Sequence, residues 1–133
     1  MSLNLRLLVL RHETDLKHHV IDPVGDLYLD QDYSILSRIS RPNGDATQDD
    51  PKMPRSDDVP VYPLPEQLQI RVAQYNSPAT RSDRYGKELT YTHAGELGRL
   101  PDPEPEETTK FNRAILAFVR ALPPNLPVVL YWH

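Results

Sequence analysis

Five histidines and nineteen acidic side chains are the residues of this 133-residue sequence best suited to chemistry. His12, His18 and Asp22 come close together near the N-terminus, where short strands are expected. On an extended segment His18 and Asp22 share one face, because side chains alternate along a strand. Imidazole and carboxylate groups together suit zinc or manganese. These three residues are a candidate metal site of a small metal-dependent hydrolase; the simpler interpretation is that they are exposed polar residues beside a turn.

His93 and Glu96 form a second candidate pair. They are three residues apart on an expected helix, so both can face one site. Di-iron proteins use the reverse order, Glu-x-x-His, with further glutamates on long helices, and this sequence has neither. The pair is therefore kept as part of the metal-hydrolase hypothesis, with a capping or exposed role for His93 as the simpler interpretation.

Recognisable catalytic motifs are missing from the sequence. It has no cysteine, which excludes disulfide scaffolds, zinc ribbons and thiol catalysis. The spacings of serine hydrolases, P-loops and dinucleotide-binding loops are also missing. We therefore predict no catalytic residue and no cofactor, and favour a non-enzymatic binding or accessory protein over an enzyme.

Aromatic residues in the second half of the chain are the predicted binding residues. Tyrosine and tryptophan are enriched at protein interfaces. On a final strand Tyr131 and Trp132 point to opposite faces, so one of them is expected to be partly exposed; packing beside Phe118 in the core is the alternative. The predicted binding set is Tyr85, Tyr91, Tyr131 and Trp132.

Charge and hydropathy limit the partners. The formal net charge is −4, so the basic footprint of a nucleic-acid binder is missing. No apolar run approaches the ~20 residues that cross a bilayer, and the N-terminus lacks a signal-peptide pattern. We expect a cytoplasmic protein whose partner is another protein. An immunity-type inhibitor with acidic loops over a basic toxin is a further alternative.

The elements expected to position these residues combine strands and helices. Alternating leucines predict a central first strand over 3–10, and Asp22-Pro23-Val24-Gly25 predicts a hairpin turn between Val20–Ile21 and Leu27–Leu29. Strands are also expected at 89–91 and 127–133. The predicted helices cover 31–40, 66–75 (or a strand over 68–72), 93–100 with Thr92 as cap, and a last helix capped by Thr108 or Thr109.

The last helix has the clearest pattern. Its apolar residues recur at helical spacing and predict one broad core-facing stripe. The stripe comprises Phe111, Ala114, Ile115, Phe118, Val119 and Leu122. The 14 prolines gather mainly in long connectors, at 42–65 and 101–105. The whole predicts a single α+β domain over 1–133, with a small, mostly antiparallel sheet of three to four strands covered by three to four helices.

Three segments resemble small phage- and prophage-encoded proteins. LDQDYSILSRIS (29–40) is similar to their acidic segment leading into an apolar helix. LTYTHAGELGRL (89–100) is similar to their Thr-capped short helix, and PVVLYWH (127–133) to their closing strand. The departures are the ending at His133, where that strand tends to be acidic, and the long proline-rich loop. The resemblance implies an accessory protein of a mobile element and assigns no residue roles.

Overall fold

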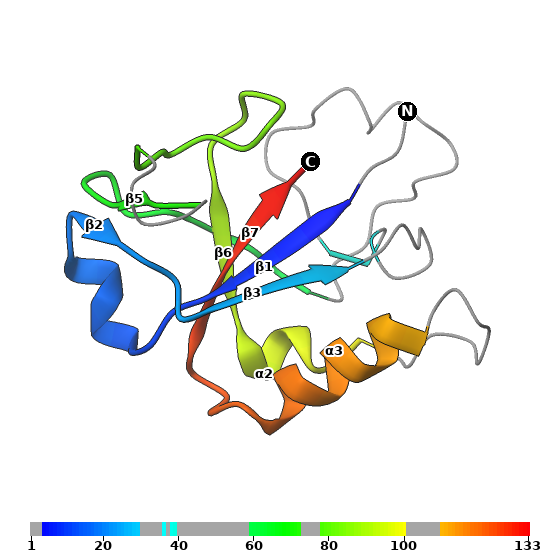
Figure 1. Ribbon diagram of the computed structural model, residues 1–133. Helices are drawn as coiled ribbons and strands as arrows, with labels where there is room; N and C mark the ends of the chain where they lie inside the picture. The colour runs from blue at the N-terminus through cyan, green and yellow to red at the C-terminus, as the bar shows by residue number, and fades with distance from the viewer. Residues whose placement is uncertain (1–3, 30–35, 37, 40–58, 73–77, 101–109) are drawn as a thin grey trace.

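The computed structural model describes residues 4–29, 36, 38–39, 59–72, 78–100 and 110–133 (Figure 1). A five-stranded sheet forms its centre, and every neighbouring pair of strands in it is antiparallel. In spatial order the strands are β3 (Gly25–Leu29), β1 (Leu5–Val9), β7 (Pro127–Trp132), β6 (Thr90–His93) and β4 (Tyr62–Pro63). The prediction of a mostly antiparallel α+β sheet is confirmed, with one strand more than expected.

Strand β1 lies inside the sheet because both of its faces are apolar. Leu5 and Leu7 point to one face, and Leu8 points to the other. All three are fully buried. A strand that is covered on both faces has a nearly continuous apolar sequence. This pattern in the sequence predicts the central position of β1.

Helices cover one face of the sheet. Helix α2 (Ala94–Leu97) and helix α3 (Lys110–Ala121) lie side by side below it (Figure 1). Leu97 of α2 and Leu116 of α3 belong to the same buried cluster as Leu130 of β7. Among the described residues the α-helices number two, fewer than the three to four predicted, with one 3-10 helix, η1 (Glu13–Lys17).

The opposite face of the sheet is covered partly by a second, smaller layer. Strand β2 (Val20–Ile21) pairs in parallel with β5 (Gln69–Ile70). Ile21 and Ile70 form a second buried cluster with Leu8 of the central strand. The sheet is therefore buried on both sides, by helices on one and by a strand pair and loops on the other.

The predicted hairpin is wrong. Val20–Ile21 pairs with β5, whereas β3 pairs with β1. The Pro23-Val24-Gly25 segment instead turns the chain from the small layer into the main sheet, where the Val24 amide donates to the Val9 carbonyl at 2.9 Å.

The helix predicted over 66–75 is also wrong. The alternative of extended backbone holds at β5, and 73–75 lie outside the described residues. Thr92 is not a helix cap: it is buried in β6, and His93 is the residue that precedes α2. The helix predicted over 31–40 lies mostly outside the described residues, as do Thr108 and Thr109.

The predicted stripe of the last helix is wrong for its largest members. Phe111 and Phe118 are 62% and 48% exposed. The residues that α3 buries are Asn112, Leu116 and Val119, at i, i+4 and i+7. The helix is therefore rotated relative to the prediction, and its phenylalanines lie outside the core. Among the described residues, no helix is long and apolar enough to span a bilayer.

Candidate functional site

The exposed side of α3 is the first candidate site. Leu116 and Val119 anchor the helix to the sheet, so its rotation is fixed from the buried side. Phe111 and Phe118 are seven residues apart, close to two full turns, and therefore lie one above the other. Ile115 and Leu122 sit half-buried between them and the core. We call these four residues the α3 ridge.

The exposed side of α3 next to the α3 ridge is lined by small residues. Ala114, Ala117 and Ala121 are exposed, so a partner can approach the helix backbone there. The helix carries three cations, Lys110, Arg113 and Arg120, and no carboxylate. This charge contrasts with the net charge of −4 of the whole chain.

Two of these cations contact other groups of the protein. The Nε atom of Arg120 donates to the Gly98 carbonyl at 3.1 Å, which fixes one cation beside the end of α2. The Lys110 ammonium lies 5.4 Å from the centre of the Phe111 ring, in cation–π range. Arg113 and Arg120 are seven residues apart and lie about half a turn around the helix from the α3 ridge, so their charge does not border the exposed phenylalanines.

A second candidate site lies where β4, β6 and α2 meet. Because Tyr62 of β4 is paired with Tyr91 of β6, the two side chains share the sheet face opposite the helices. His93 follows two residues after Tyr91 on that face, and its extended backbone starts α2. Its Nδ1 atom lies 2.7 Å from Oε1 of Glu96. The structure therefore brings together three residues singled out in the sequence, Tyr91, His93 and Glu96.

Glu96 is the centre of this second site. The Tyr62 hydroxyl lies 3.0 Å from each of its carboxylate oxygens. The hydrogen bond to Glu96, together with burial and the carboxylate charge, raises the pKa of Tyr62 above its usual value. The rings of Tyr62, Tyr91 and His93 lie 5.3–5.7 Å apart, in contact with one another. Rings packed this closely do not form an open cage for a cationic ligand.

The arrangement suits proton exchange better than metal binding. A histidine whose Nδ1 faces a carboxylate can offer Nε2 as a base. A metal site needs further ligands. In the described part of the chain, no three His, Asp or Glu side chains gather closely enough to hold a metal ion.

The N-terminal candidate residues lie apart from this site. His12 and His18 are exposed at the two ends of η1. The Asp22 carboxylate is 3.2 Å from the Arg71 guanidinium, in an exposed ion pair. His12, His18 and Asp22 are thus not assembled into a metal-holding group in the structure described.

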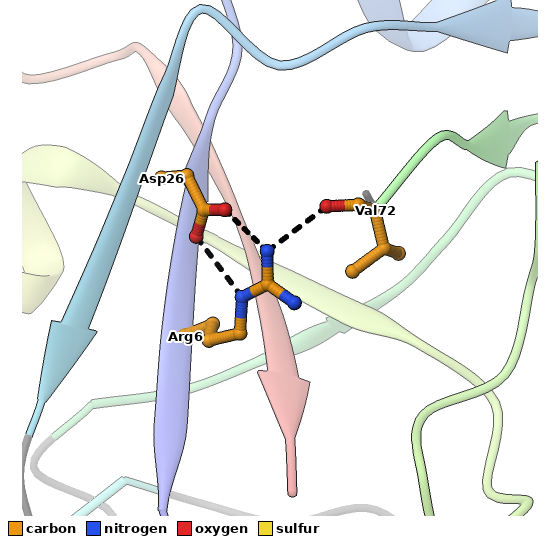
Figure 2. Close-up of polar contacts among 3 residues, drawn as sticks. All are labelled: Arg6, Asp26 and Val72. Carbon is orange, nitrogen blue, oxygen red and sulfur yellow. Dashed lines mark hydrogen bonds and ion pairs between the residues drawn. The ribbon is translucent and has the colours of Figure 1, made fainter. Parts of the chain in front are cut away.

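A third polar cluster is built around Arg6 (Figure 2). Its guanidinium contacts both carboxylate oxygens of Asp26 on the neighbouring strand and donates to the Val72 carbonyl at 2.9 Å. It also lies 4.9 Å and 5.6 Å from the ring centres of Tyr28 and Tyr131. A cation with this many internal partners ties the sheet to the 59–72 segment and is structural rather than available to a ligand.

His133 belongs to the same cluster. Its ring contacts Tyr28 and Tyr131. Burial, with the positive charges of Arg6 and Arg84, lowers the pKa of His133 below its usual value of 6.5. The neutral imidazole is therefore the form that the folded protein favours.

The aromatic residues predicted to bind partners have different environments. Trp132 is buried in the core cluster on the helix-covered side of the sheet, and Tyr131 is half-buried beside Arg6. Tyr91 is half-buried in the second site. Tyr85 is exposed in a turn where its amide donates to Asp83 at 2.8 Å.

Comparison with protein-family models, curated proteins and solved structures finds no match.

The sequence pattern does not identify all the residues of these sites. It places Phe111 and Phe118 in the core, and it gives no indication of Tyr62 or Arg6. The sequence carries no local signal for Tyr62, because Tyr62 meets Glu96 only through the pairing of β4 with β6.

Proposed function

We propose that this chain is a non-enzymatic binding or accessory protein that acts through contact with another protein, and that the exposed side of α3 is its contact surface. The observation that carries the proposal is the exposure of Phe111 and Phe118 on a helix otherwise anchored in the core. Neighbouring exposed aromatic residues are favourable anchors for a protein partner.

The free energy gained by covering Phe111 and Phe118 is large enough for the centre of an interface. Covering the exposed parts of two phenylalanine side chains removes on the order of 200 Å² of apolar surface from water. At about 25 cal/mol per Å², that is worth roughly 5 kcal/mol before the costs of association. The exposed alanines beside the α3 ridge allow a partner to approach the helix closely.

Two observations make an enzyme the weaker choice. The carboxylate of Glu96 is already occupied by Tyr62 and His93, so this cluster also serves to hold the edge strand β4 against β6 and α2. The N-terminal histidines are exposed, and in the described residues they belong to no group of side chains that could hold a metal ion.

The origin and the partner type are also proposals. An accessory role in a phage or other mobile element follows from the three resembling segments, and a cytoplasmic location follows from the sequence. The inhibitor alternative depends on acidic segments at 45–58 and 102–107, which lie outside the described residues.

The test is site-specific photocrosslinking in host cells. A photoreactive side chain replaces Phe118 in one full-length variant and Val20 in a matched control, because Val20 is 44% exposed on the β2–β5 layer. We expect a discrete protein adduct from position 118 and none from position 20. Equal adduct yields from both positions, or none from position 118, would overturn the proposal.

A further inference from the structure

We draw no further inference here: the strongest candidate, the apolar ridge on the exposed side of helix α3, already carries the proposed function, and nothing in the structure shows what kind of partner covers it.

Discussion

Two neighbouring apolar residues of α3 should respond in opposite ways to truncation. Leu116 is fully buried against the sheet, whereas Phe118 is 48% exposed. If the rotation of α3 is as described, Leu116→Ala should destabilise the protein strongly and Phe118→Ala only weakly. The sequence pattern alone predicts the reverse order, because phenylalanine is the larger apolar residue in the expected stripe.

The magnitudes follow from burial. Truncation of a fully buried leucine costs about 2–5 kcal/mol, since the lost transfer energy is joined by a cavity. Full burial of a phenylalanine side chain is worth about 1.5–3 kcal/mol. About half of that surface is already in water for Phe118, so Phe118→Ala should cost about 1 kcal/mol and leave no closed cavity.

Urea unfolding monitored by tryptophan fluorescence is the assay. Trp132 is the one tryptophan of the chain, and it is only 4% exposed, beside the core residues that α3 covers. Its emission should shift on unfolding in all variants. A loss for Phe118→Ala equal to or larger than that for Leu116→Ala would refute the rotation of α3, and with it the contact surface.

Three further predictions concern other parts of the fold. Arg6→Met should cost about 2–4 kcal/mol, because it removes the bonds to Asp26 and to the Val72 carbonyl; Asp26→Asn, at a more exposed position, should cost about 1 kcal/mol or less. Gly95→Ala should destabilise by about 1–3 kcal/mol in the same urea assay, since its Cβ would lie 2.8 Å from the Cβ of Pro124; a neutral or stabilising effect would contradict that contact. Wild-type stability should fall relative to His133→Phe as the pH decreases below 6.5, because the unfolded His133 takes up a proton before the folded one does. Identical pH profiles of the two proteins would rule out that coupling.

The central strands could be predicted because their patterns depend on local burial. Leu5 and Leu7 alternate toward one face and Leu8 lies on the other, so the sequence itself indicates a strand covered on both sides. The closing strand, Pro127–Trp132, is an unbroken apolar and aromatic run that follows several prolines. Its bounds could therefore also be predicted.

Long-range pairing could not be predicted. Val20–Ile21 offers only two residues, and its partner Gln69–Ile70 lies far away in the sequence. The nearby Pro23-Val24-Gly25 turn favoured the local hairpin instead. In the same way, Tyr62 reaches Glu96 only because β4 pairs with β6, a contact that no local pattern contains.

The prediction of which side of α3 is buried was wrong for a different reason. Its apolar residues occupy two neighbouring arcs of the helix, and the period of the pattern is the same whichever arc faces the sheet. Size favours the phenylalanines for the core, yet Asn112 is buried and Phe111 is not. Only the packing of Leu116 and Val119 against the sheet decides between the arcs.

The crosslink yield at position 118 shows directly whether α3 is the contact surface for a protein partner. We expect a protein adduct from a photoreactive side chain at position 118 that is absent from the similarly exposed position 20 and is lost when Phe111→Ser is added. An adduct yield at position 118 no higher than at position 20 would contradict it.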